Sequence, residues 1–274
     1  MAEIIQKERI LPHNFDIVPG MEDVHDLMTG YGWSAADHWL AQHQLGSNTP
    51  PIIVPLNGGI VPLIYTRHTV LSLYRDSVPD FMKSVVFTDN DQTGRLTFSG
   101  EVPLNRPWLV LDDIVDQADT ITNLAALNSS LSLFAPVQKP HTHNAMRKLP
   151  DTVSVRTEKE IPNEWVWSGA GMNRKRLPVA GDVSAQDQAY ISAMQRLGGI
   201  GTTRNVDKWG EPDFETQRIF FSTHMLAWAK QSPLLQMLTN LDLAKIEGKL
   251  DTQFQLATLL QKQLTDPKQV YFLN

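Results

Sequence analysis

Four short apolar runs recur along the first two thirds of the chain, and each is continuous rather than alternating. They span residues 52–56 (IIVPL), 84–88 (SVVFT), 108–113 (WLVLDD) and 131–135 (LSLFA). Runs of this length are typical of strands buried on both faces, as in a parallel sheet. Because helix-like or loop-like stretches separate them, the pattern predicts an α/β fold with a mainly parallel, doubly wound sheet.

Helices are predicted on either side of this sheet region. Near the N-terminus, Ser34–Asp37 reads as a capping box that opens a helix ending at Gly46. Towards the C-terminus, Ser184–Asp187 opens a second capped helix, and amphipathic stretches follow at 216–230, 234–247 and 251–264. Ser232 is a good N-cap for the second of these stretches, with Pro233 at the first helical position. The chain therefore divides into a sheet domain, 1–181, and a helical C-terminal extension, 182–274, whose apolar stripes should pack on the first domain or on a second subunit.

Composition narrows the choice of partners. The sequence has 274 residues, a formal net charge of −6 and no cysteine, which excludes disulfides and thiol chemistry. A net negative charge does not favour nucleic-acid binding, which relies on Lys and Arg. No stretch approaches the roughly 20 apolar residues of a membrane span. We therefore expect a cytoplasmic protein with no nucleic-acid or membrane partner.

The clearest candidate ligand-binding residues lie in the segment from Trp108 to Leu124. The apolar run ends in Asp112 and Asp113, Asp116 follows after two apolar residues, and Thr120 enters a predicted helix. The free N–H groups of a helix start favour a phosphate, and carboxylates at a strand end bind ribose hydroxyls or, through water, Mg²⁺. This spacing suits a sugar phosphate.

The segment resembles the phosphoribosyl-pyrophosphate-binding motif of type I phosphoribosyltransferases, which is an apolar strand, two acids, two apolar residues, an Asp and a phosphate loop. The alternative is an unrelated α/β protein that ends a strand in acids, as nucleoside triphosphatases and response regulators do. Further segments over about 48–181 resemble the hypoxanthine-guanine branch of the family. By this resemblance we expect its fold, with a small hood over the sheet.

Two loops and one lysine carry part of the resemblance. Asn57, Gly58 and Gly59 are similar to the pyrophosphate loop of the branch, although a Gly-Gly pair also suits a plain turn. Residues 90–94 resemble its flexible lid, with Thr93 and Gly94 near the tip, and a polar surface hairpin is the alternative. Lys139 resembles the lysine of the branch that recognises the exocyclic oxygen of a 6-oxopurine. The alternative is an ordinary surface lysine.

The remaining match is residues 161–173, which resemble the base-binding segment. The resemblance implies that Trp165 or Trp167 stacks on the base, with Val166 between them, although a buried Trp is usually just core. Asn173 takes the place of a metal-binding Asp. Arg176 resembles the arginine that completes the pyrophosphate site, and a solvated basic cluster with its neighbours is the alternative.

The resemblance implies transfer of the 5-phosphoribosyl group from phosphoribosyl pyrophosphate to a purine-type base, as in purine salvage, by a homodimer or homotetramer. Asp116 would take the base proton, while Asp112 and Asp113 would hold the ribose hydroxyls and, with Asn173, the Mg²⁺. The 5-phosphate would lie in a loop made of Gln117, Ala118, Asp119 and Thr120.

Departures from the family keep two other functions open. The loop lacks the usual Thr-Gly after Asp116, Asp119 adds a negative charge, and Asn173 is a neutral ligand. One alternative is a regulator on the same fold that binds the pyrophosphate donor or a nucleotide without turnover. The other is a phosphoribosyltransferase for a modified purine, a pyrimidine or another small amide.

Overall fold

The computed structural model describes residues 22–44, 49–56, 58–115, 117–160, 184–187, 189–190, 193 and 230–268. The elements are α1 (Glu22–Gln44), β1 (Ile52–Pro55), α2 (Ile60–Leu73), η1 (Arg75–Ser77), α3 (Val78–Lys83), β2 (Val85–Asn90), β3 (Leu96–Phe98), β4 (Trp108–Leu111), β5 (Ile114–Val115), α4 (Asp119–Leu127), β6 (Leu131–Gln138), η2 (Pro140–Thr142), α5 (His143–Met146), β7 (Ser154–Glu160), α9 (Pro233–Ile246) and α10 (Leu250–Thr265). None of these helices has both the length and the apolar character that crossing a membrane requires.

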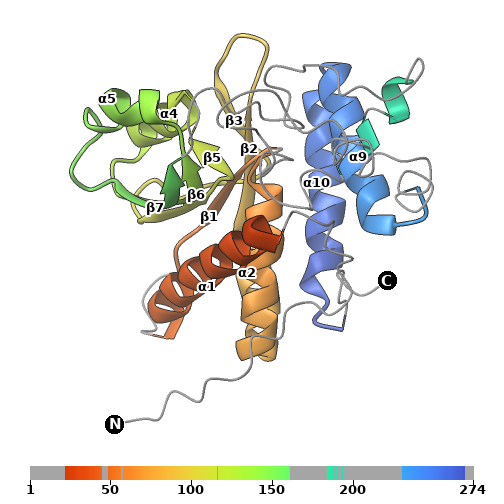
Figure 1. Cartoon of the computed structure of the whole chain (residues 1–274), viewed down its shortest axis with the longest axis horizontal. Coiled ribbons are helices and arrows are strands. Elements are labelled where there is room, and N and C mark those ends of the chain that lie inside the picture. Colours follow the sequence, from red (N-terminus) through yellow and green to blue (C-terminus); the bar gives the residue numbers. More distant parts are fainter. Residues whose placement is uncertain are drawn as a thin grey trace.

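Within the described residues, seven strands form one mostly parallel sheet in the order β3-β2-β1-β4-β6-β5, and β7 also pairs with β6. Strand β1 lies between β2 and β4, so that Ile53 is level with Val86 on one side and Val110 on the other. The four predicted strands and their parallel arrangement are confirmed (Figure 1). Strand β3, which is antiparallel to β2, and strand β7 were not predicted.

The predicted strand 108–113 ends at Leu111 as β4, and an unpredicted strand, β5, continues the same path along β6 from Ile114. Leu111 pairs with Phe134 and Ile114 with Val137, which is the same register on both sides of the break. The interruption falls at Asp112 and Asp113, opposite a stretch of β6 that contains Pro136. Because proline has no N–H to donate, the ladder lacks one hydrogen bond there. The two acids therefore lie in an interruption of the sheet.

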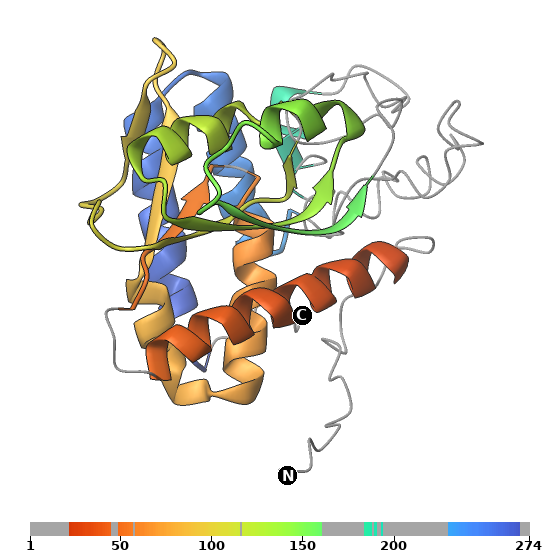
Figure 2. The ribbon, with the colours of Figure 1, turned by 90° about the vertical axis from the view of Figure 1, so that its left-hand side faces the viewer.

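Helices cover both faces of the sheet, as predicted for a doubly wound fold. Figure 2 shows α4 and α5 on one side and α1 and α2 on the other. Alternate strand residues divide between two apolar clusters, since neighbouring side chains point to opposite faces. The α1–α2 cluster contains Ile52, Val54, Val85, Phe87, Leu109 and Leu111 from the strands. The α4 cluster contains Ile53, Trp108, Val110, Leu131, Leu133 and Ala135.

The predicted start of the N-terminal helix is wrong, because α1 begins at Glu22 rather than beside Ser34. The Ser34 hydroxyl donates to the Gly30 carbonyl oxygen at 3.2 Å, so it bonds back along the helix and caps nothing. A Cβ on Gly32 would lie 2.8 Å from the Tyr65 carbonyl oxygen, and the glycine thus allows α1 to approach the backbone of α2. Tertiary packing overrides the low helix propensity of glycine here.

The C-terminal helices pack on the same core as the sheet, as one of the two expected arrangements. Leu238 and Leu241 of α9 and Leu260 and Leu264 of α10 are buried in the α1–α2 cluster. Gln261 of α10 donates to the carbonyl oxygens of Met82 and Val85, at 2.6 and 2.9 Å, beside the start of β2. Two predicted N-caps are confirmed: Ser232 accepts from Leu235 N at α9, and Ser184 accepts from Asp187 N.

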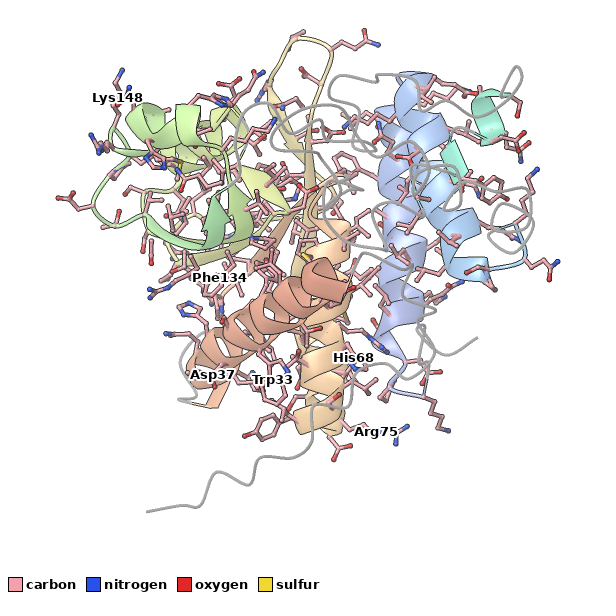
Figure 3. The ribbon with its side chains drawn as sticks, viewed as in Figure 1. Trp33, Asp37, His68, Arg75, Phe134 and Lys148 are labelled. Carbon is pink, nitrogen blue, oxygen red and sulfur yellow. The ribbon has the colours of Figure 1, made fainter. Side chains whose placement is uncertain are left out.

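Arginines of α2 and η1 hold the C-terminal end of α10. The buried Arg67 donates through Nε to the Leu264 carbonyl oxygen at 2.8 Å and through Nη2 to that of Asp266 at 2.8 Å. Arg75, at the foot of α2, donates to the Pro267 carbonyl oxygen at 3.1 Å (Figure 3). Carbonyl groups left open at the end of a helix thus receive charged donors. The extension is fixed to the sheet domain by hydrogen bonds as well as by apolar contact.

Candidate functional site

Polar groups gather where three neighbouring strands end. Asp89 lies in the last part of β2, Gly58 and Gly59 follow β1, and Asp112 and Asp113 follow β4. The three strands are parallel and adjacent, so their carboxyl ends meet at one edge. Ligands of open α/β sheets bind outside this edge. The topology therefore supplies the predicted position for a site.

The glycine loop and the acid pair are in direct contact, although more than 50 residues separate them in the sequence. A Cβ added at Gly58 would overlap the carboxylate of Asp113 and would lie 3.1 Å from Oδ1 of Asp112. A Cβ at Gly59 would overlap the Leu111 carbonyl oxygen and lie 3.0 Å from that of Pro55. Gly59 thus requires glycine because backbone oxygens occupy the space of a Cβ, whereas a side chain at position 58 would displace the Asp113 carboxylate.

The acid pair is electrostatically strained. Burial and the adjacent Asp113 raise the pKa of Asp112 well above its usual value, although the backbone N–H of Asp113 donates to Oδ1 of Asp112 at 3.0 Å and opposes that rise. Burial, followed by the same two acids, also raises the pKa of Tyr31 of α1, whose hydroxyl donates to the Phe134 carbonyl oxygen at 2.8 Å. A cation or a hydroxyl donor at this pair would relieve the repulsion.

The start of α4 has an unusual backbone. Ala118, its N-cap, has φ 62° and ψ 7°, and it is the one described residue other than glycine with a positive φ. The resemblance places the missing glycine of the phosphate loop at or beside this position, and the left-handed conformation that glycine adopts freely is retained here at a cost of roughly 1–2 kcal/mol. Gln117 and Asp119 are exposed and Thr120 is half-buried.

Thr93 and Gly94 lie in the tight turn between β2 and β3, as predicted. Oδ1 of Asp91 accepts from the backbone N–H of Thr93 at 2.8 Å, from its hydroxyl at 2.6 Å and from the N–H of Arg95 at 3.0 Å. These bonds lower the pKa of Asp91. Gly94 has φ 80° and no atom within 4 Å of an added Cβ. The segment is a polar surface hairpin, and its closure as a lid stays a prediction.

Lys139 is buried, with 8% of its surface exposed, directly after β6. Its backbone N–H donates to the Val115 carbonyl oxygen at 3.0 Å. The interpretation of Lys139 as a surface lysine is therefore wrong. Its predicted contact with a base remains a prediction, although it lies at the same edge of the sheet as the acid pair.

Several predicted site residues lie outside the described residues. They are Asn57, Asp116, Trp165, Val166, Trp167, Asn173 and Arg176. The sequence reasoning also overlooked Asp89, even though an acid directly after a buried run was the signal that identified Asp112. Burial raises the pKa of Asp89, and the charge of Lys245 from α9 opposes this effect. Nothing in the sequence pattern of α9 indicated that it would approach the site.

The acid pair suits a cation that also has ligands from a substrate. In the part of the chain that the structure describes, no three His, Asp or Glu side chains gather to hold a metal ion by themselves. Mg²⁺ usually takes one or two carboxylates together with substrate phosphates and waters. Asp112 and Asp113 supply that number of carboxylates, and their mutual repulsion favours a divalent cation. The residues present fit the expected Mg²⁺.

Comparison with known proteins adds little to this geometry. No family model and no curated protein matches the chain. A hypoxanthine phosphoribosyltransferase from Staphylococcus aureus is 17% identical, with a TM-score of 0.33 over 57% of this chain and 82% of that one. A hypothetical protein from Neisseria gonorrhoeae with bound ppGpp is 15% identical, with a TM-score of 0.30 over 52% and 81%. At these values neither likeness supports a conclusion about this chain.

Proposed function

We propose that the protein transfers the 5-phosphoribosyl group of phosphoribosyl pyrophosphate to a purine-type base. The observation that carries the proposal is the contact of Gly58 with the carboxylates of Asp112 and Asp113, a few residues before the start of α4. One edge of the sheet thus offers a backbone loop for an anion, acids for ribose hydroxyls and open helix N–H groups for a phosphate. The motif from Trp108 to Leu124 predicts the acids and the helix start, and the resemblance of Asn57, Gly58 and Gly59 predicts the loop.

The reaction needs few groups from the protein. A base nitrogen forms the new bond to the anomeric carbon, the bond from that carbon to the diphosphate oxygen breaks, and diphosphate leaves with the electron pair. Asp116 takes the proton of the base nitrogen, and Asp112 and Asp113 orient the sugar through its hydroxyls. Mg²⁺ on the acid pair, when bound, would neutralise charge on the leaving diphosphate.

Incubation with phosphoribosyl pyrophosphate, Mg²⁺ and a panel of bases tests the proposal, with nucleotides detected by mass spectrometry and diphosphate by a coupled assay. We expect one nucleotide and an equal amount of diphosphate. Asp116→Asn should lower turnover at least about tenfold. Asp151→Asn, at an exposed acid shortly before β7, is the matched control and should keep most of the activity. Unchanged turnover in Asp116→Asn would remove that residue as the base.

Gly58→Ala tests the observation itself. The added methyl group would displace the Asp113 carboxylate. We expect the KM for the donor to rise about tenfold, which is the usual effect of losing one charge-assisted interaction. Gly100→Ala is the control, since its added Cβ would have no atom within 4 Å. An unchanged KM in Gly58→Ala would mean that the acid pair does not hold the donor.

A second candidate is a regulator that binds the same donor or a nucleotide without turnover. The strained Ala118 favours it, because the loop after Asp116 carries a left-handed alanine and lacks both the glycine and the threonine of the motif that it resembles. The same incubation separates the two functions. Tight donor binding by calorimetry with no diphosphate release from any base would support the regulator and contradict the transferase.

A further inference from the structure

The helical extension approaches the site edge through the end of α9. The turn between α9 and α10 lies against the β2–β3 hairpin, since a Cβ on Gly248 would be 3.9 Å from Nε2 of Gln92. Gln92 is in the hairpin that begins directly after Asp89 and Asn90. Figure 1 shows the blue helix α10 nearer to β2 and β3, with α9 on its far side. A segment from the far end of the sequence thus borders the candidate site.

Lys245 is the cation in the last turn of α9, and it is exposed. Its carbonyl oxygen accepts from Gly248 N at 3.1 Å, which fixes its backbone beside the hairpin contact. The charge of its ammonium group opposes the effect of burial on the pKa of Asp89. A side chain of the extension therefore acts on an acid at the end of β2, the strand beside the glycine loop.

Asp89 lies on the face of β2 that α9 and α10 cover. Val85 and Phe87 belong to the α1–α2 cluster, which α9 and α10 complete, and alternation along β2 puts Asp89 on the same face. Asp89 and the acid pair lie on opposite sides of β1, about 10 Å apart at the usual spacing of strands. A flexible lysine beside this gap can reach an anion that lies over Gly58.

We propose that Lys245 binds the anionic part of the ligand, so that the helical extension completes the site. This inference rests on the proposed function and names the diphosphate of the donor as the group bound. An anion placed over Gly58 meets the negative charges of Asp89, Asp112 and Asp113, and it needs a cation there besides Mg²⁺. Lysine suits this role because its ammonium is a compact charge on a flexible stem.

The test is calorimetric binding of phosphoribosyl pyrophosphate with Mg²⁺ to the full chain and its variants. Lys245→Met should raise Kd about tenfold, the weight of one charge-assisted hydrogen bond, and Lys245→Arg should restore most of the affinity. Lys249→Met is the matched control: Lys249 lies four residues further on, is exposed and forms an ion pair with Glu247. It should change Kd less than twofold.

Two further measurements separate binding from structure and from the proposed function. The affinity of the wild type should fall more steeply with salt than that of Lys245→Met, because one fewer charge is screened in the variant. Inorganic diphosphate with Mg²⁺ is the second probe. If the wild type binds either probe and Lys245→Met binds it equally well, the inference is wrong and the proposed function stands. If the wild type binds neither, both are wrong.

Discussion

The glycine loop after β1 and the glycine turn of the β2–β3 hairpin need glycine for different reasons. Gly58 and Gly59 have negative φ values and no room for a side chain, since carboxylate and backbone oxygens from the β4 strand end occupy the space of a Cβ. Gly94 has φ 80° and open space around it. The first loop needs glycine because of its tertiary neighbours, and the second because of its own turn.

This difference separates the roles that each loop can have. A loop pressed against Leu111 and Asp113 has a fixed place, and it can present backbone N–H groups with the precision that binding an anion requires. The β2–β3 hairpin is held by bonds to Asp91 within the turn itself, so it can move as a unit without breaking them. Only the second arrangement is compatible with a lid.

The largest effect is expected for Gly59→Ala. The methyl group would overlap the Leu111 carbonyl oxygen, which is backbone and cannot rotate away, so we expect a loss of about 3 kcal/mol in the free energy of unfolding. Denaturant unfolding measures it. Gly100→Ala, where the added group meets nothing within 4 Å, should stay within about 1 kcal/mol. Equal stability of the two variants would contradict the close contact of the first loop.

Asp112→Asn should stabilise the protein at neutral pH by roughly 2 kcal/mol. Burial raises the pKa of Asp112 in the folded state, so the destabilisation is absent below the unfolded pKa of about 3.9, grows as the pH rises through the folded pKa and is complete above it. Unfolding at pH 3 and pH 7 measures the effect, which should appear only at pH 7.

The control for that pH dependence is Asp119→Asn. Asp119 is exposed in the first turn of α4, where a negative charge is favourable, so its removal should destabilise the helix by about 0.5 kcal/mol. A stabilisation by Asp112→Asn that is equally large at pH 3 would show that the buried charge is not its cause.

Gly94→Ala should cost about 1 kcal/mol, because an alanine at φ 80° is strained although it clashes with nothing. Gly94→Asn should cost less, since asparagine tolerates this conformation. Thermal unfolding measures both variants. A loss in Gly94→Ala as large as in Gly59→Ala would mean that the hairpin is also packed against the core.

The smallest effect is expected at Ala118. Ala118→Gly relieves the strain of φ 62° but removes a buried methyl group, and these terms nearly cancel, leaving a change within about 1 kcal/mol. Ala126→Gly, at an exposed position in the last turn of α4, should cost up to about 1 kcal/mol. If the buried Ala118→Gly proved the more costly of the two, Ala118 would not be left-handed in solution.

Prediction from the sequence succeeded where the signal was local. The continuous apolar runs identified β1, β2, β4 and β6, and the Ser232-Pro233 pair placed the start of α9. It failed where packing decided, as at Gly32 within α1, or where a strand was too short to stand out, as with β3. The break between β4 and β5 depends on Pro136 of a neighbouring strand, which no reading of 108–115 alone can reveal.

The sequence by itself determined the class of the sheet and the acids that close its inner strand, because burial on both faces and a helix start leave patterns within a few residues. The tertiary structure alone decided that Gly58 meets Asp113, that Lys139 is buried and that the turn after α9 lies beside the β2–β3 hairpin. Each of these depends on where segments far apart in the chain come to lie, and a contact of that kind leaves no periodic trace in either segment.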